Sequence, residues 1–204
     1  MLHPRTVFQK LLKMSKTIFY FHGFKSSSDS TKAHNLKKFI KHNTKNTLIS
    51  IPDLSDSFED AIEEINKLIE DCETDIVFMG SSLGGYYATY FSQLLNVRAV
   101  LINPAIPPLK GFDIHLGKNE NYATGHKFII EKSNIAFLRS LKVKKLSNPE
   151  NIMVLVESGD EILPFEKTVS YFNGAHLDIT YGGDHSYQSL TNKYIKIKEF
   201  LNLS

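Results

Sequence analysis

Six short apolar runs alternate along the chain with longer stretches of helical periodicity. Each run is rich in β-branched and aromatic residues, and Gly or Pro follows most of them. Continuous runs of this kind are typical of strands buried on both faces of a parallel sheet, whereas half-buried strands alternate polar and apolar positions. The predicted strands cover residues 17–21, 47–51, 76–79, 99–102, 152–156 and 177–181.

The segments between these runs carry apolar residues at steps of three and four, which is the period of an amphipathic helix. The longest apolar stripe runs from Phe58 to Cys72, and Ser57 with Asp60 predicts a capping box at its start. Regular alternation of strands and helices, with right-handed crossovers, predicts a doubly wound parallel sheet with helices on both faces. Further helices are expected after Asp29, at residues 83–95 and 165–172, and at the carboxyl end from Tyr194 to Leu201.

The domain organisation is expected to be simple. Residues 1–15 are interpreted as a tail outside the fold, and residues 16–204 as one domain. Residues 105–150 interrupt the alternation of strands and helices and contain several Pro and Gly residues. We expect this stretch to be a cap-like insertion over the carboxyl ends of the strands, where open α/β sheets bind their ligands.

Composition and charge exclude several other classes of protein. Hydrophobic residues make up 42% of the 204 residues, which excludes disorder as the main state. With 24 Lys plus Arg against 22 Asp plus Glu, the net charge is +2, so nothing indicates a nucleic-acid partner or a stable membrane association. Cys72 is the only cysteine, which excludes an internal disulfide and fits a cytoplasmic location. No motif indicates a cofactor or a metal ion.

The third predicted strand runs directly into the sequence Gly-Ser-Ser-Leu-Gly-Gly, which begins at Gly80 and leads into a helix. A Gly-x-Ser-x-Gly motif between a strand and a helix is the nucleophile elbow of α/β-hydrolases. Gly80 and Gly84 lack a Cβ, which lets the flanking strand and helix approach closely around a sharp turn. The sequence therefore predicts that Ser82 is a nucleophile.

A nucleophilic serine needs a base, and the base needs an acid to orient it. In α/β-hydrolases the chain order is Ser, then Asp or Glu, then His. His185 is the one histidine in the loop after the last predicted strand, and Asp160 follows the fifth strand. Glu161 and Glu157 are alternative acids, although Glu157 is expected to lie on the strand itself.

An oxyanion formed at Ser82 would need two backbone N–H donors. We expect one from Leu83, directly after the nucleophile, and one from Phe24, in the loop after the first strand. Gly23 allows the turn that aims the second donor. His22 is interpreted as a buried hydrogen-bonding anchor for this loop.

Six segments together resemble the YqiA-type small bacterial esterases of the α/β-hydrolase superfamily. The segments are FHGFKSS from Phe21, GSSLGGYYAT from Gly80, INPAIPP from Ile102, LGKNENYATG from Leu116, SGDEIL from Ser158 and GGDHSY from Gly182. The resemblance implies a compact serine hydrolase that acts on short-chain acyl esters and on acyl thioesters. It carries the family's nucleophile, acid and base onto Ser82, Asp160 and His185.

Two other functions are compatible with parts of this pattern. A catalytically silent α/β-hydrolase fold could serve only to bind a ligand, but complete triad candidates argue against it. A nucleotide-binding module is disfavoured because Ser82 stands where Gly-x-Gly-x-x-Gly requires its second glycine, and no Gly-Lys-Ser/Thr follows. The expected partner is therefore a small acyl ester or thioester substrate.

Overall fold

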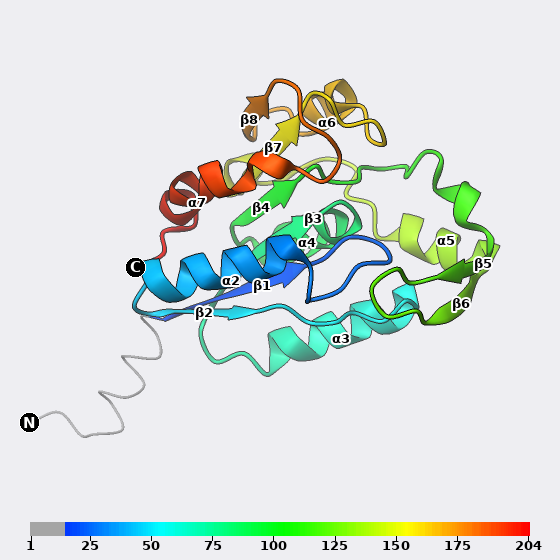
Figure 1. Cartoon of the computed structure of the whole chain (residues 1–204), viewed down its shortest axis with the longest axis horizontal. Helices are drawn as coiled ribbons and strands as arrows, with labels where there is room; N and C mark the ends of the chain where they lie inside the picture. The colour runs from blue at the N-terminus through cyan, green and yellow to red at the C-terminus, as the bar shows by residue number, and fades with distance from the viewer. Residues whose placement is uncertain (1–14) are drawn as a thin grey trace, which may run out of the picture.

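The computed structural model describes residues 15–204, and its centre is a six-stranded parallel sheet with the strand order β2-β1-β3-β4-β7-β8 (Figure 1). All six predicted runs coincide with these strands, and the predicted parallel sheet is confirmed. The predicted tail lies outside the described residues, apart from Ser15. The strands are β1 (Lys16–Phe21), β2 (Thr47–Ser50), β3 (Asp75–Ser81), β4 (Ala99–Ile102), β7 (Ile152–Glu157) and β8 (His176–Thr180).

The two edge strands differ from the prediction that every run is buried on both faces. Leu48 of β2 is 60% exposed, and Ile179 of β8 is 37% exposed. Each edge strand has a neighbour on one side only, so burial of its side chains is incomplete. His176, expected before the last strand, is the first residue of β8, and its ring packs against Phe200 at a centroid distance of 5.2 Å.

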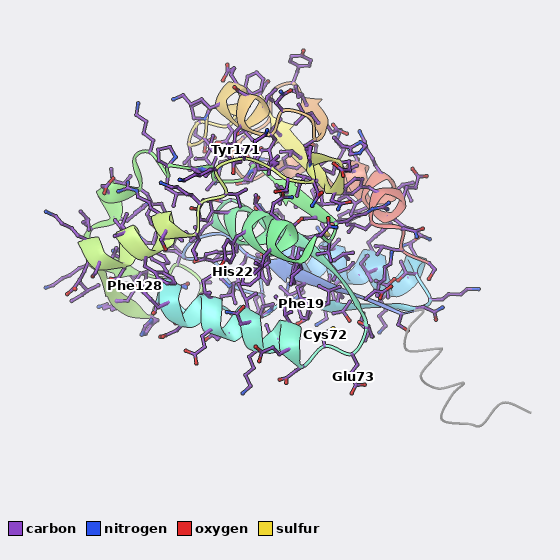
Figure 2. The ribbon with its side chains drawn as sticks, turned by 180° about the vertical axis from the view of Figure 1, so that it is seen from behind. Phe19, His22, Cys72, Glu73, Phe128 and Tyr171 are labelled. Carbon is purple, nitrogen blue, oxygen red and sulfur yellow. The ribbon has the colours of Figure 1, made fainter. Side chains whose placement is uncertain are left out.

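Helices cover both faces of the sheet, as predicted. In β1, Ile18 and Tyr20 pack with α2 and α7, whereas Phe19 and Phe21 pack with α3 and α4 on the opposite face. Figure 2, which views the molecule from behind, shows α3 and α4 in front of the sheet. The helices are α2 (Thr31–Asn43), α3 (Phe58–Glu70), α4 (Leu83–Leu95), α5 (Lys132–Ser140), α6 (Phe165–Tyr171) and α7 (Tyr194–Leu201).

The start of α3 departs in one detail from the predicted capping box. The Ser57 hydroxyl accepts a hydrogen bond from the Asp60 amide at 3.3 Å, as the box requires. The Ser57 amide, however, donates to the Ser55 hydroxyl at 3.1 Å and not to the Asp60 carboxylate. The Ser57 amide is therefore bound by the neighbouring Ser55, and only one of the two hydrogen bonds of a capping box is formed.

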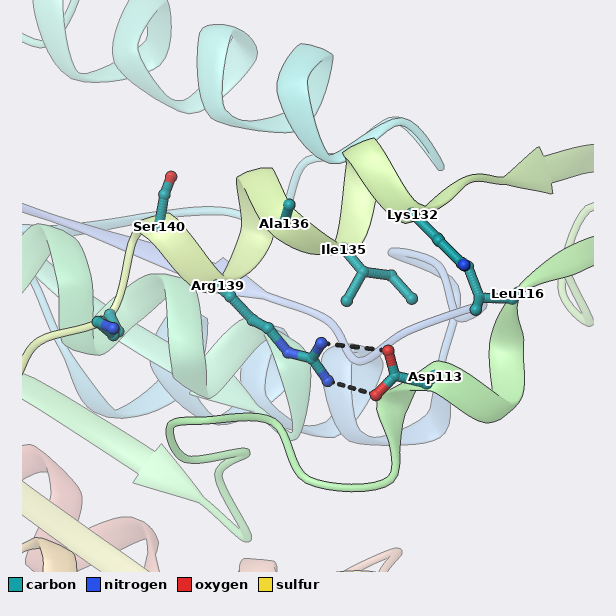
Figure 3. A pocket seen from close by; sticks show the side chains of 8 residues that line it. Asp113, Leu116, Lys132, Ile135, Ala136, Arg139 and Ser140 are labelled. Atoms are coloured by element: carbon teal, nitrogen blue, oxygen red, sulfur yellow. Dashed lines mark hydrogen bonds and ion pairs between the residues drawn. The ribbon is translucent and has the colours of Figure 1, made fainter.

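The segment between β4 and β7 covers the stretch for which the sequence predicted a cap-like insertion. It contains the hairpin of β5 (Gly117–Glu120) and β6 (Lys127–Ile130), followed by α5. Arg139 of α5 donates to both carboxylate oxygens of Asp113 (Figure 3). It also donates to the carbonyls of Pro108 and Leu109. One guanidinium group therefore fastens α5 to the beginning of the insertion.

The hairpin is attached to loops at the carboxyl edge of the sheet. Asn121, which is 4% exposed, donates to the Asp56 carboxylate at 2.9 Å, and His126 contacts the other oxygen of Asp56 at 2.9 Å. The Tyr122 amide donates to the Lys25 carbonyl at 3.2 Å. The insertion therefore lies beside the loops that follow β1 and β2, which is the edge expected for a cap.

Candidate active site

Ser82 lies in a strained turn between β3 and α4. Its φ of 53° and ψ of −119° fall where residues with a side chain are rarely found. A Cβ on Gly80 would be 2.1 Å from the Gly84 carbonyl oxygen, and a Cβ on Gly84 would be 2.1 Å from the Phe21 carbonyl oxygen. Because both obstacles are backbone atoms, only glycine fits at either position, and the turn holds the Ser82 hydroxyl above the sheet.

The structure brings Ser82, His185 and Asp160 together from the ends of three strands. The His185 Nε2 lies 3.1 Å from the Ser82 Oγ, and the His185 Nδ1 lies 2.8 Å from the Asp160 Oδ2. The Asp160 side chain is 2% exposed, and its Oδ1 accepts the amides of Ile162 and Leu163 at 2.9 and 2.8 Å. This chain of contacts connects the loops after β3, β7 and β8.

The two contacts of His185 determine the position of its proton. The Asp160 carboxylate only accepts hydrogen bonds when it is ionised, so the Nδ1 of His185 is the nitrogen that donates. The Nε2 is then left with its lone pair and accepts from the Ser82 hydroxyl. This arrangement can remove a proton from Ser82 and stabilise the resulting imidazolium through Asp160.

The two alternative acids contact the backbone around His185 and not its ring. Glu157, which is 1% exposed at the end of β7, accepts the Asp184 amide at 2.9 Å. The Glu157 carboxylate also accepts the amide and the hydroxyl of Ser189. Glu161 accepts the His185 amide at 3.0 Å. Both carboxylates therefore help to position the histidine loop.

Asn103 is a positioning residue that the sequence analysis missed. It directly follows β4, is 2% exposed, and has a φ of 39°. Its Nδ2 donates to the carbonyls of Asp184 and His185 at 3.0 and 3.3 Å, and its Oδ1 accepts the Glu157 amide at 3.0 Å. The signal that the sequence offered for this role is the position of Asn103, directly after a predicted central strand.

The loop after β1 passes close to the nucleophile. A Cβ on Gly23 would lie 3.3 Å from the Ser82 Cβ. His22, labelled in Figure 2, is 8% exposed, with its Nδ1 2.9 Å from the Gly23 carbonyl and its Nε2 accepting the Leu54 amide at 3.2 Å. His22 is thus a buried anchor for this loop, as interpreted from the sequence.

Of the two expected amide donors, Phe24 is part of this loop, and Leu83 directly follows the nucleophile at the start of α4. Phe24 lines a hollow of about 270 Å³ that contains Ser82 and His185. Leu83 and Phe24 together line a smaller hollow next to it. The ring of Phe24 packs against Phe112 and His115, with centroid distances of 5.2 and 4.9 Å.

A second hollow, of about 300 Å³, lies between the insertion and the loop that carries Asp160. Residues 105–110 form one wall, and residues 162–164 form part of the other, and most of these side chains are apolar. Because Asp160 binds the amides of Ile162 and Leu163, this wall is attached directly to the candidate acid.

Two findings concern residues 15–204 as a whole. Within this range, no group of three His, Cys, Asp or Glu side chains is placed to hold a metal ion. The helices of the same range are all too short or too polar to cross a bilayer.

The arrangement of the sheet and the elbow is that of the α/β-hydrolase fold, and solved structures agree. Alpha/beta hydrolase domain-containing protein 10 from mouse superposes with a TM-score of 0.69 and 16% identity, covering 91% of this chain and 89% of that one. Est1E from Butyrivibrio proteoclasticus, solved with ferulic acid bound, superposes with a TM-score of 0.70 and 16% identity, covering 93% and 89%.

Within that fold, the chain belongs to the uncharacterised protein family UPF0227, whose model matches residues 17–202. A UPF0227 protein of Pectobacterium carotovorum is 24% identical over 190 residues, which cover 91% of this chain and 99% of the relative. The UPF0227 protein YcfP of Escherichia coli is 23% identical over the same shares. The family agrees with the YqiA-type resemblance found in the sequence.

Proposed function

We propose that this protein is a serine esterase that hydrolyses short-chain acyl esters, and acyl thioesters, through an acyl-enzyme intermediate. The observation that carries the proposal is the unbroken series of contacts from Ser82 through His185 to Asp160. A structural serine at the turn would not need a strained backbone or an imidazole directed at its hydroxyl.

In the first half of the reaction, the Ser82 Oγ attacks the acyl carbon while its proton moves to the Nε2 of His185. The amides of Phe24 and Leu83 donate to the oxyanion that forms. When the tetrahedral intermediate collapses, the bond to the leaving oxygen or sulfur breaks, and His185 returns the proton to that atom. The acyl group is then an ester of Ser82.

In the second half, water attacks the acyl carbon and passes one proton to the Nε2 of His185. The second tetrahedral intermediate breaks the bond to the Ser82 Oγ, which takes the proton back. The products are a carboxylic acid and the alcohol or thiol. Asp160 stays ionised throughout and stabilises the imidazolium in both halves.

The test of the proposal is hydrolysis of p-nitrophenyl butyrate by the purified protein and by the Ser82→Ala variant. We expect the variant to lose kcat by a factor on the order of 10⁶, down to the background rate. Ser140→Ala is the matched control, because Ser140 is an exposed residue of α5 whose hydroxyl contacts only a backbone carbonyl of that helix.

A fluorophosphonate probe gives a second readout that does not depend on the choice of ester. We expect one adduct, which peptide mapping assigns to Ser82 and not to the adjacent Ser81. Equal rates for the protein and Ser82→Ala, or a stable adduct on another residue, would overturn the proposal. The proposed location is the cytoplasm, supported by the single cysteine, Cys72.

A further inference from the structure

A lysine lines the same hollow as the catalytic candidates. Lys32, in the first turn of α2, donates from its Nζ to the Ser81 hydroxyl at 2.9 Å. It lines the hollow of about 270 Å³ together with Ser82 and His185. Lys32 is the one Lys or Arg of this lining, and no carboxylate belongs to it.

Most of the other side chains of this lining carry a polar group. The lining includes the hydroxyl-bearing residues Ser26, Ser30 and Ser186 as well as Ser81. Apolar substrates gain affinity from apolar walls, which this molecule provides in the separate hollow beside Asp160. The hollow at Ser82 therefore offers hydroxyl groups and one ammonium group to a bound molecule.

Lys32 forms no ion pair with another residue of the range 15–204. Among residues 15–204, the ion pairs formed by lysines involve Lys193 and Lys196 only. The carboxylates that act on Lys32 from the neighbouring loops are Asp184, Glu157 and Asp160.

These three carboxylates are bound elsewhere. Asp184 accepts the Ser186 amide and the Gln188 side chain, Glu157 accepts bonds within the histidine loop, and Asp160 faces His185. An ammonium group has three protons to donate, and the Ser81 hydroxyl accounts for one of them.

We propose that Lys32 is a specificity residue that binds an anionic group of the substrate, so that the preferred esters carry a carboxylate or a phosphate close to the scissile bond. The inference rests on the proposed esterase activity and deepens it. A carboxylate in the hollow would accept from Lys32, and the serine hydroxyls would donate to its other lone pairs. The anion thereby places the acyl carbon next to Ser82.

Two positions of the anion fit this chemistry, and two pairs of substrates distinguish them. For an anion on the acyl side, mono-p-nitrophenyl succinate is compared with p-nitrophenyl butyrate, which has an acyl chain of equal length and no charge. For an anion on the leaving group, 4-acetoxybenzoate is compared with its methyl ester. Spontaneous hydrolysis is measured with Ser82→Ala and subtracted.

The measured quantity is the ratio of kcat/KM for the charged ester to that for its neutral partner. We expect Lys32→Met to lower this ratio by about 10- to 100-fold for at least one pair, which is the effect of losing a charge-assisted hydrogen bond. Lys32→Arg keeps the charge and should retain most of the ratio. Damage to the fold or to the elbow lowers both rates equally and leaves the ratio unchanged.

A ratio that is the same in the protein and in Lys32→Met for both pairs overturns the inference, while Ser82-dependent hydrolysis of the neutral esters would still support the proposed function. If instead no ester is turned over, the proposed function fails, and binding decides the role of Lys32. Calorimetry with succinate then compares Ser82→Ala with Ser82→Ala/Lys32→Met. We expect at least tenfold weaker binding in the double variant, and equal affinities would overturn the inference.

Discussion

The substitution Asp160→Asn tests the proposed role of the acid, because the surrounding backbone determines how the new amide is oriented. In the protein, one oxygen of Asp160 accepts the Ile162 and Leu163 amides, and the other faces the Nδ1 of His185. An asparagine that keeps its oxygen on the two amides must turn its NH₂ group toward His185. The ring nitrogen that faces it then has to accept a hydrogen bond.

The cost of the opposite orientation follows from the same contacts. Turning the NH₂ group toward the two amides would leave backbone donors facing a donor. Counting only Leu163, whose amide is part-buried, an unsatisfied donor costs about 1–3 kcal/mol, which favours the first orientation by about 5- to 150-fold. With its Nδ1 accepting, His185 carries its proton on the Nε2 and cannot take one from Ser82.

We therefore expect Asp160→Asn to lower kcat for p-nitrophenyl butyrate by about 10⁴-fold, the loss that the wrong histidine tautomer causes in a Ser-His-Asp triad. Stopped assays and thermal melts on the same samples separate this loss from unfolding. The control is Asp178→Asn, the same substitution on β8, where the carboxylate pairs with Lys193 and Lys196. A folded Asp160→Asn variant with more than a tenth of the original kcat would refute the assigned role.

Three further predictions follow from particular contacts. Glu157→Gln weakens the hydrogen bonds that hold the histidine loop, so we expect kcat to fall by about 10- to 100-fold while KM changes by less than about threefold. Saturation kinetics measures both, and an unchanged kcat would contradict the positioning role of Glu157. Gly84→Ala puts a Cβ 2.1 Å from the Phe21 carbonyl oxygen, so we expect the variant to be less stable than the protein or not to fold. If it folds, overpacking should lower the free energy of unfolding by about 1–3 kcal/mol, which corresponds to a melting temperature lower by roughly 2–12 °C. Burial lowers the pKa of Lys32, so succinate binding to Ser82→Ala should be strongest near neutral pH, where the carboxylates of the ligand are ionised. Binding should weaken as the pH rises through a value below the ordinary lysine pKa of about 10.4, and an affinity that stays constant from neutral pH to about pH 10.4 would contradict this prediction.

The central sheet could be predicted because its signal is local. Each buried strand is a short apolar run with its own boundaries, and the order of runs and helices leaves few allowed topologies. The hairpin of β5 and β6 had a weaker signal, because β5 has no apolar side chain and the apolar run of β6 is only Phe128 to Ile130. Its strands contain Lys118, Glu120 and Lys127, and a two-stranded ribbon with exposed faces requires no continuous apolar run. The insertion was visible in the sequence only as an interruption.

The site was predictable to the extent that its residues lie within sequence motifs. Ser82 is part of a recognisable turn, and the order of acid and base along the chain limits the choice to a few residues. Asn103 lies in the INPAIPP segment, but nothing in that segment indicates its role, and Lys32 lies in none of the quoted segments. Their contacts join segments far apart in sequence: Asn103 binds the histidine loop, and Lys32 reaches Ser81 from α2. Such pairings appear only when the strand order places those loops at one edge.

The positioning contacts also explain the presence of Glu157 in addition to Asp160. The histidine loop contains Gly182 and Gly183, both with positive φ, and such a loop has a high conformational entropy when it is free. A Cβ on Gly183 would be 2.0 Å from a Glu157 oxygen, so the glycine allows the carboxylate to lie directly against the backbone. Glu157 and Asn103 thus bind backbone atoms of the loop, while Asp160 is left free to bind the imidazole. Different side chains therefore fix the loop and orient the ring.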